Sequence, residues 1–325
     1  MPGLTHVIKK RPLLNAPDKL PEFQLAGWSA RQLASVEDAL TRWVACPGSA
    51  PAPAGLGDAM RYAVLDGGKR LRPLLVLAAC EAVGGNPHAA LRSACAVELI
   101  HAYSLVHDDM PCMDNDVLRR GKPTVHVKFG EAQALLAGDA LQALAFEFLT
   151  PEDGTVDAAM QARLCRMLAC AAGFRGMAGG QAIDLASVGL MLDSAQLHEM
   201  HGLKTGALLQ ASVMMGASCG TASDAVLDAL RDYGAAVGLA FQVVDDILDV
   251  TADSATLGKT AGKDVAQDKP TFVSLMGLEA SKDYAQQLLT RALTSVDALH
   301  SLDGNGLHAT AALRALADML VNRQH

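Results

Sequence analysis

The feature that most limits how this chain can fold is an apolar run that ends in clustered carboxylates. The run reaches Asp108 and Asp109, Asp114 follows shortly after, and Arg119 and Arg120 lie just beyond. Unneutralised like charges beside an apolar helical face weaken a fold. Hard divalent cations neutralise such acids, and Mg²⁺ is usually held by one or two carboxylates plus phosphate oxygens. The pattern therefore favours a metal and phosphate site over its alternative, a solvated helix end with a charged loop.

The spacing within this cluster predicts a local excursion of the backbone. Asp114 is six residues beyond Asp108, so the two side chains would not share one helical face. Pro111 lies between them and interrupts a regular helix. We therefore predict that the intervening residues loop out and return Asp114 to Asp108, where both could hold one metal. His101 and Ser104 lie on the same helical face as Asp108, which makes His101 a candidate phosphate ligand.

A second acidic cluster repeats this layout without the interruption. Gln242, Asp245 and Asp249 are spaced i, i+3 and i+7, with Asp246 beside them, in a predicted helix over residues 225–250. We expect the two acid-bearing helices to face each other across a cavity.

Composition favours packed helices over sheets. The 325 residues are 50% hydrophobic but only 4% aromatic, and Leu, Ala, Val and Met dominate. We predict an all-α fold with one domain over residues 28–325, preceded by a mobile leader or expression remnant over residues 1–27. The expected helices cover residues 28–46, 56–65, 74–83, 87–108, 125–149, a segment ending near 186, 194–219, 225–250, 272–298 and 306–322.

Charge and cysteine usage exclude several classes of protein. The net charge is −8 and there is no basic tract, so we expect no nucleic-acid partner. The seven cysteines show no CxxC spacing, which fits reduced thiols in the cytoplasm better than disulfides or zinc. No apolar stretch follows the N-terminal basic residues and no uncharged run reaches 18 residues, so we expect neither a signal peptide nor a membrane span.

A glycine turn supplies positive charge to the start of another apolar helix. Gly67 and Gly68 precede Lys69, Arg70 and Arg72. Glycines allow close backbone approach to a ligand, and cations on one turn can converge on a phosphate. The spacing is not that of a Walker loop, so it does not imply nucleotide binding. The alternative is a helix-entry turn with solvated cations.

Three further segments carry polar groups where a packed helix would not need them. Gln181 and Asp184 lie one turn apart, either as a buried polar pair or as support for a metal site. Glycines flank Lys204 and Thr205 in the middle of a helix, which predicts a kink or a close approach there. Residues 256–271 form a Gly- and Lys-rich stretch suited to a lid over phosphates.

Together these motifs resemble the trans-isoprenyl diphosphate synthases from about residue 30 to the end of the chain. The resemblance implies a helical bundle around a central catalytic cavity, a homodimer, and three Mg²⁺ ions for which Mn²⁺ can substitute. Val117 departs from the family pattern, in which many members carry another Asp. The matching segments are residues 67–73, 107–124, 180–185, 204–206, 241–249 and 262–271.

The resemblance also implies roles for individual residues. Two metals would be held by Asp108 and Asp114 and the third by Asp245, with support from Asp109, Asp246 and Asp249. The allylic diphosphate would be bound by Arg119, Lys204 and Lys259. Isopentenyl diphosphate would be bound at the glycine turn and nearby cations, namely Gly68, Lys69, Arg72, His101 and Arg120. Carbocation stabilisation would come from the Lys204 carbonyl, Thr205 and Gln242, and lid closure from Lys269.

The implied reaction is head-to-tail prenyl transfer, in which isopentenyl diphosphate is condensed with dimethylallyl and then geranyl diphosphate. Tyr103 lies about 7.5 Å below Asp108 at the standard helical rise, so its ring would form the pocket floor. Tyr103 with Ser104 resembles bacterial members that make farnesyl diphosphate, and we therefore predict a C15 product. A geranylgeranyl or geranyl product is the alternative. More distant alternatives are a terpene cyclase, which would lack the glycine turn, and a non-catalytic partner subunit, which would lose an acidic cluster.

Overall fold

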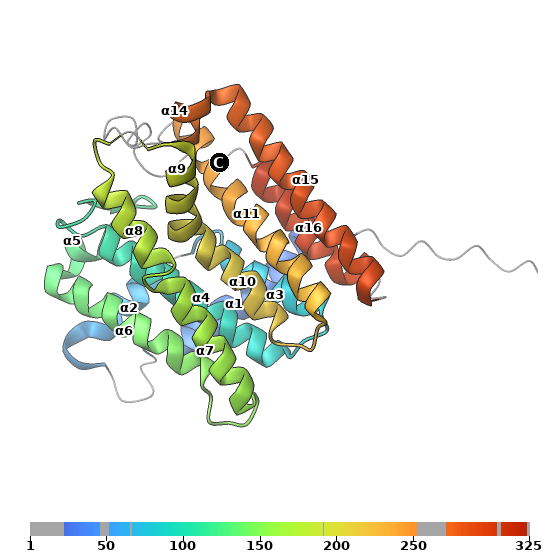
Figure 1. Cartoon of the computed structure of the whole chain (residues 1–325). Helices are drawn as coiled ribbons and strands as arrows, with labels where there is room; N and C mark the ends of the chain where they lie inside the picture. Colours follow the sequence, from blue (N-terminus) through green and yellow to red (C-terminus); the bar gives the residue numbers. More distant parts are fainter. Residues whose placement is uncertain are drawn as a thin grey trace, which may run out of the picture.

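The computed structural model describes residues 23–45, 52–65, 67–190, 192–251, 271–303 and 307–323, and over these ranges it confirms the all-α prediction (Figure 1). A 3₁₀ turn over Pro53–Gly55, a π-helix over Gly202–Gly206 and a short hairpin of β1 (Leu118–Arg119) and β2 (Lys122–Pro123) accompany the α-helices. The helices are α1 (Leu25–Trp43), α2 (Leu56–Val64), α3 (Leu71–Ala82), α4 (Pro87–Asp108), α5 (Val125–Phe129), α6 (Glu131–Leu149), α7 (Ala158–Ala172), α8 (Met177–Ala186), α9 (Ser194–His201), α10 (Ala207–Ala217), α11 (Asp224–Thr251), α14 (Phe272–Met276), α15 (Leu278–Asp303) and α16 (Leu307–Val321).

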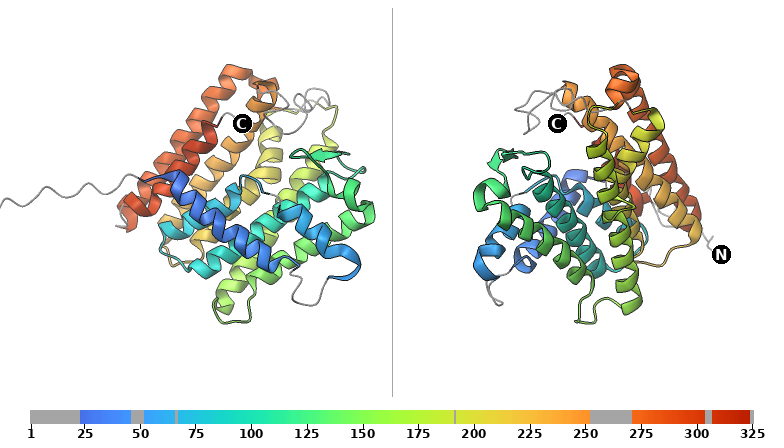
Figure 2. Two further views of the ribbon diagram at one scale, coloured as in Figure 1. Left: turned by 180° about the vertical axis from the view of Figure 1, so that it is seen from behind. Right: turned by 60° about the vertical axis from the view of Figure 1, so that its left-hand side comes forward.

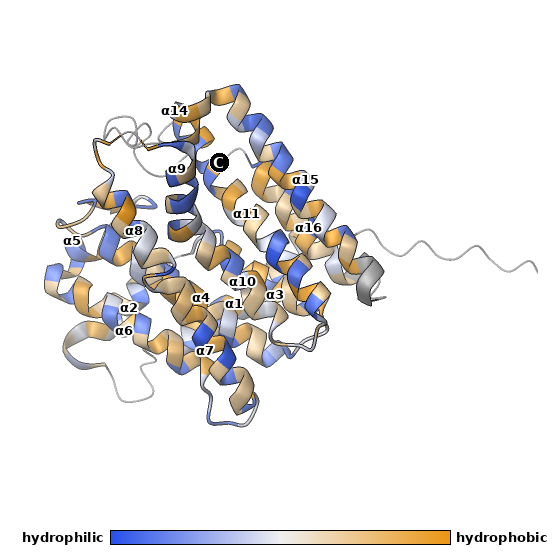
Figure 3. Cartoon of the chain, in the orientation of Figure 1, coloured by the Kyte–Doolittle hydropathy of each residue, from blue (hydrophilic) through white to orange (hydrophobic). Residues whose placement is uncertain are grey.

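The core is built on α3, α4 and α10. Helix α4 packs mainly against α6 and α3, and α10 packs against α3 and α11. Helix α11 in turn packs along α15, which with α16 covers one side of the bundle (Figures 1 and 2). At Gly216 a side-chain carbon would lie 2.1 Å from the Val76 carbonyl oxygen, so α3 and α10 can approach only because that position is glycine. Apolar residues are concentrated on these inner helices, whereas α15 shows mixed hydropathy (Figure 3).

The first acidic cluster is carried by the most buried long helix. The side chain of Asn86 caps α4 by accepting hydrogen bonds from the backbone N–H of His88 (2.9 Å) and Ala89 (3.2 Å), and Pro87 occupies the first turn. By length and hydropathy α4 could cross a membrane, but 67% of its apolar window is buried inside the protein, as in the core helix of a globular bundle. Helix α4 therefore delivers Asp108 from the core to one end of the bundle.

Three expected helices are broken. The helix expected over 125–149 divides at Gly130 (φ 89°), and that expected over 272–298 divides at Gly277 (φ 86°). Positive φ is costly for other residues, so each glycine marks a true chain reversal. The helix expected to end near Ala186 is two helices, α7 and α8. The helical periodicity continues across these breaks, which explains why the predicted segments were too long.

Two other features differ from prediction. Helix α1 begins at Leu25, three residues before the start of the domain expected at residue 28. The expected leader otherwise falls on residues 1–22, outside the described residues. The hairpin was not predicted: its strands pair Leu118 with Pro123 and Arg119 with Lys122. It follows the acidic cluster and lies at the edge of the bundle (Figure 2).

Candidate active site

The first acidic cluster closes on itself as predicted. After α4 ends, the Asp114 N–H donates to the Asp108 carbonyl oxygen at 2.8 Å, so the segment containing Pro111 loops out and returns. Burial raises the pKa of the Asp108 carboxyl to about 6 against the opposing effect of Lys204, and Asp114 and Asp109 raise it further. The cluster therefore holds negative charge that the protein alone does not neutralise well.

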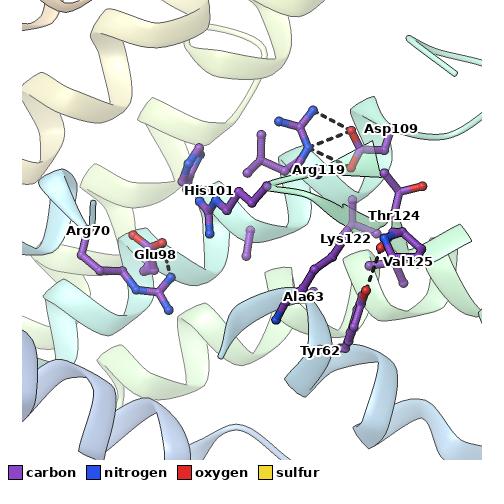
Figure 4. Close-up of a pocket in the computed structure, with 15 residues that line it drawn as sticks. Tyr62, Ala63, Arg70, Glu98, His101, Asp109, Arg119, Lys122, Thr124 and Val125 are labelled. Atoms are coloured by element: carbon purple, nitrogen blue, oxygen red, sulfur yellow. Dashed lines mark hydrogen bonds and ion pairs between the residues drawn. The ribbon is translucent and has the colours of Figure 1, made fainter. Parts of the chain in front are cut away.

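Arg119 partly neutralises this cluster from the hairpin. Its Nε and Nη2 donate to Asp109 Oδ1 at 2.9 and 2.6 Å, and Nε also lies 2.9 Å from Oδ2 (Figure 4). Asp109 is 3% exposed, whereas the Arg119 side chain is 32% exposed, so the ion pair is partly buried. A residue expected to bind a diphosphate is thus paired with an acid expected to support a metal.

The second cluster uses its acids differently. Asp246 is buried and accepts from Gln242 Nε2 (2.9 Å) and from the backbone N–H of Phe272 (2.8 Å). The Thr205 hydroxyl donates to Gln242 Oε1 at 3.0 Å. These bonds connect the π-helix, α11 and the first residue of α14. Asp246 was expected to support a metal, but the structure places it in this internal network. Asp249 is buried as well.

Asp245 is the member of the second cluster with a half-exposed carboxylate, and a C-terminal arginine contacts it. Arg323 Nη2 donates to Asp245 Oδ1 (2.5 Å) and to the Phe241 carbonyl (3.1 Å), and its guanidinium lies 4.3 Å from the Phe241 ring centre. Sequence reasoning missed Arg323 because it stands in no motif. A single arginine after the last helix gives no signal that distinguishes it from a solvated end.

The predicted disturbance at Lys204 is the π-helix over Gly202–Gly206. Such segments occur often at functional sites. At Gly180 a side-chain carbon would lie 2.1 Å from the Lys204 backbone nitrogen, so only glycine lets α8 contact this turn. Lys204 Nζ donates to Asp184 at 2.5 Å, and both amide atoms of Gln181 are buried without a hydrogen-bond partner. Asp184 therefore holds Lys204, while Gln181 lines the cavity.

The glycine turn brings cations together as expected. At Gly68 (φ 136°) a side-chain carbon would lie 2.8 Å from the Arg120 guanidinium, so the missing side chain makes room for it. Arg120 also donates to the Gly67 carbonyl. Burial lowers the pKa of Arg72, and its Nε has no partner. The pKa of Lys69 is lowered by burial and then by Arg323. This group of cations is positioned for an anion.

His101 joins this group as a neutral side chain. Burial and then the nearby charges of Arg72 and Arg120 lower its pKa well below the usual value of 6.5. At neutral pH it can donate one hydrogen bond without adding charge.

Two adjoining cavities connect the acids to the cations. One, of about 380 Å³, is lined by Tyr103, Ser104, Asp108, Gln181, Lys204 and Thr205. The other, of about 970 Å³, is lined by Gly68, Lys69, Arg120, Phe241 and Arg323. Arg72 and His101 line both. Together the cavities can accept two anionic ligands whose reactive ends meet between them.

Tyr103 lies in the wall of the smaller cavity, one and a half turns before Asp108. It is 9% exposed, and its ring meets the edge of the His107 ring with centroids 5.8 Å apart. His107 Nε2 is 3.1 Å from the Leu135 carbonyl, so the imidazole is itself fixed by α6. The Tyr103 ring is therefore packed against a neighbour that is held in place.

The acids fit a hard divalent ion that a ligand helps to hold. Among the residues described, no three His, Cys, Asp or Glu side chains converge into a complete metal site. Mg²⁺ usually takes only one or two carboxylates, with phosphate oxygens and waters completing its shell, so this finding fits such an ion. The all-oxygen donors and the raised pKa of Asp108 point the same way. Lys259 and Lys269 lie outside the described residues.

A model of the family described as polyprenyl synthetase matches residues 53–301. The chain belongs to this family. This polyprenyl synthetase is thus a prenyltransferase of isoprenoid synthesis, as the motifs predicted. It is 48% identical over 279 residues to the large subunit 1 of a heterodimeric geranylgeranyl pyrophosphate synthase of Arabidopsis thaliana, covering 84% of this chain and 73% of that protein.

Solved structures of related enzymes share the fold of this polyprenyl synthetase. An FPP/GFPP synthase from Zymomonas mobilis, in its apo form, matches with a TM-score of 0.77 and 40% identity, covering 92% of this chain and all of the other. A geranyltransferase from Helicobacter pylori, complexed with magnesium and isoprenyl diphosphate, matches with a TM-score of 0.78 and 35% identity over 94% and 98% of the two chains.

Proposed function

We propose that this polyprenyl synthetase condenses isopentenyl diphosphate with dimethylallyl and geranyl diphosphate, and that growth ends at farnesyl diphosphate. The observation that carries the proposal is the pair of adjoining cavities. One has the acids of α4 at its mouth and Tyr103 in its wall, and the other has Lys69 and Arg120 in its lining. Two diphosphates bound in this way would meet beside Thr205 and Gln242.

In this proposal the allylic diphosphate binds near Asp108, Asp114 and Lys204, and isopentenyl diphosphate binds among the cations. Bound Mg²⁺ would neutralise the departing diphosphate. The allylic C–O bond breaks, the alkene of isopentenyl diphosphate forms the new C–C bond, and the released diphosphate takes up the lost proton. The oxygen dipoles of Thr205 and Gln242, fixed by their hydrogen bond, stabilise the positive charge in a site with little water.

Two observations bear on the product length, and they favour different lengths. Tyr103 is fixed in the wall of the allylic cavity, which favours a short C15 chain. The overall likeness favours C20, since the curated plant relatives at 44–49% identity are described as geranylgeranyl pyrophosphate synthases. We place C15 first because identity averages over the whole chain, whereas chain growth is limited by the few side chains that it meets. Geranylgeranyl diphosphate is the second candidate.

Product sizing decides between the two candidates. Purified protein is incubated with labelled isopentenyl diphosphate, Mg²⁺ and each allylic primer, and the hydrolysed products are separated by chain length. We expect farnesol from dimethylallyl and geranyl diphosphate and no elongation of farnesyl diphosphate. Elongation of farnesyl diphosphate would establish the C20 candidate instead. Tyr103→Ala should then give longer products, with Tyr62→Phe as a control, because Tyr62 lies outside this cavity and its hydroxyl donates to the Pro123 carbonyl.

We further propose a homodimer that works in the cytoplasm. Leu135 and Leu136 on α6 and Val127 on α5 are about half exposed, an apolar surface that a second copy would cover. The six described cysteines are free thiols, which suits a reducing compartment. Sedimentation equilibrium of the wild type should give twice the mass of the chain, and Leu135→Lys with Leu136→Lys should give the monomer.

A further inference from the structure

Arg70 follows the glycine turn, and its side chain ties three helices together. Its Nε donates to Glu37 of α1 (2.7 Å), its Nη1 to Glu98 of α4 (2.6 Å) and its Nη2 to the carbonyl of Val64 at the end of α2 (2.5 Å). Its side chain is almost fully buried. Figure 4 shows Arg70 beside Glu98, which lies on the same helix, α4, as His101. Each of the three guanidinium nitrogens thus donates to a different helix.

The backbone of Arg70 is held in an unfavourable conformation. Its φ is 45°, in the left-handed region that non-glycine residues rarely occupy, and it immediately precedes α3. Such a residue persists only where its surroundings fix it, and here the three hydrogen bonds do so. Its carbonyl accepts from the Leu74 N–H at 3.1 Å, which starts the helix. Arg70 borders the larger cavity, as its neighbours Lys69 and Arg72 do, but its guanidinium is buried against Glu37 and Glu98.

The buried pairs also leave a surplus of negative charge behind the cations. Glu37 and Glu98 together carry two charges and Arg70 carries one. Burial lowers the pKa of Arg72 and of Arg120, and Glu98 opposes that change for both. Glu98 lines the same cavity as these cations and lies one helical turn from His101. The carboxylates therefore help to keep mutually repelling cations together before an anion arrives.

We propose that Arg70 is the positioning residue of the isopentenyl diphosphate site, acting with Glu37 and Glu98. Although Arg70 borders the larger cavity, its guanidinium is taken up by hydrogen bonds to Glu37, Glu98 and the Val64 carbonyl. It fixes the turn so that Lys69 and Arg72 present their charges to one diphosphate, and it thereby lowers the cost of ordering them on binding. This inference rests on the proposed function, because it assigns the larger cavity to isopentenyl diphosphate.

The test separates positioning from simple stabilisation. Isopentenyl diphosphate alone is titrated into the wild type, Arg70→Lys and Glu37→Gln by calorimetry, and KM is measured for both substrates. Lysine keeps the charge but cannot serve three partners at once. For Arg70→Lys we expect a Kd and a KM for isopentenyl diphosphate about 10-fold higher, with the KM for geranyl diphosphate within about 2-fold of wild type. For Glu37→Gln we expect a rise of about 3-fold.

Glu81→Gln is the matched control. Glu81 of α3 also ties α1, accepting from Trp28 Nε1 at 2.8 and 3.0 Å, but it lies outside both cavities. The Glu81→Gln substitution should lower the melting temperature and leave the affinity for isopentenyl diphosphate unchanged.

Equal losses for the two substrates, or an unchanged Kd in folded Arg70→Lys or Glu37→Gln, would overturn the proposal. If Arg70→Lys does not fold, Glu37→Gln decides, because Glu37 is partly exposed and its loss is mild. A wild type that fails to bind isopentenyl diphosphate at all would instead contradict the proposed function.

Discussion

The two acidic clusters have similar sequences but use their carboxylates differently. In the first, the chain leaves the helix and returns, so that Asp108 and Asp114 lie together at the end of α4. In the second, α11 runs without interruption, and Asp246 turns inward to Gln242 and the start of α14. Asp245 alone is half-exposed beside the cavity, where Arg323 contacts it.

This difference shows that an acidic motif does not assign its members to one task. In the first cluster, burial and then repulsion from the neighbouring carboxylates raise the pKa of Asp108. The second divides its acids between Asp245, which is partly exposed and paired with Arg323, and Asp246, which is buried. Binding of a divalent ion and a diphosphate should therefore reduce the repulsion among the carboxylates of the first cluster. In the second cluster it should displace Arg323 from Asp245.

The largest expected effect comes from Asp108→Asn. Removing this carboxylate should reduce prenyl transfer by about 10³-fold, because the charge of the departing diphosphate loses its metal support. Asp228→Asn is a suitable control, since Asp228 is an exposed acid on α11 paired only with Arg231. Turnover measured with geranyl and isopentenyl diphosphate checks the prediction, and similar losses in both variants would contradict it.

Asp245→Asn should mainly lower activity, whereas Asp246→Asn should mainly lower stability. Asp245→Asn should lower activity by about 10²-fold and change the free energy of unfolding by less than about 1 kcal/mol, because its ion pair is half-exposed. Asp246→Asn should lower the free energy of unfolding by about 1–3 kcal/mol, because an amide cannot accept both buried hydrogen bonds. Urea unfolding beside turnover measures both. Equal stability in the two variants would remove the distinction between the clusters.

The pH dependence of the free energy of unfolding should reveal the raised pKa of Asp108 in the first cluster. The folded pKa of Asp108, about 6, lies above its ordinary value of 3.8, so the folded state binds the proton more tightly. Its contribution is favourable at low pH and is lost as pH rises through about 6. Without ligand, Asp108→Asn should therefore be more stable than wild type by about 1–2 kcal/mol at pH 7.5, and the difference should shrink by pH 5. A difference independent of pH would contradict this.

The smallest expected effect concerns Arg323. Arg323→Ala frees Asp245, so Mg²⁺ in the presence of diphosphate should bind about 3-fold more tightly. Calorimetric titration measures this change, with Arg314→Ala as the control, since Arg314 pairs with Asp297 on another surface. Weaker Mg²⁺ binding in Arg323→Ala would show that the arginine helps to bind the ligand.

Local chemistry in the sequence predicted much of this site. Pro111 between two acids predicted the excursion, and glycines around Lys204 predicted the disturbance that is a π-helix. Positions set by neighbours from distant segments could not be predicted. Arg70 stands among ligand-like cations but turns inward because Glu37 and Glu98 are there to receive it. Asp246 accepts a hydrogen bond from the N–H of Phe272, 26 residues later, a contact that no local pattern indicates.

The same limit applies to the fold. Helical periodicity identified nearly every helix but passed over Gly130 and Gly277, since a chain reversal does not interrupt an apolar pattern. The predicted starts were late at α1, whose first turn contains Gly27, and at α3, whose first turn contains Arg72 and Pro73.

The most direct test measures labelled isopentenyl diphosphate incorporation into geranyl diphosphate with Mg²⁺, for wild type and Asp108→Asn side by side. The account predicts a prenyl product with wild type, none after Mg²⁺ is chelated, and about 10³-fold less with Asp108→Asn. Wild-type elongation that continues without a divalent ion, or undiminished elongation by Asp108→Asn, would contradict it.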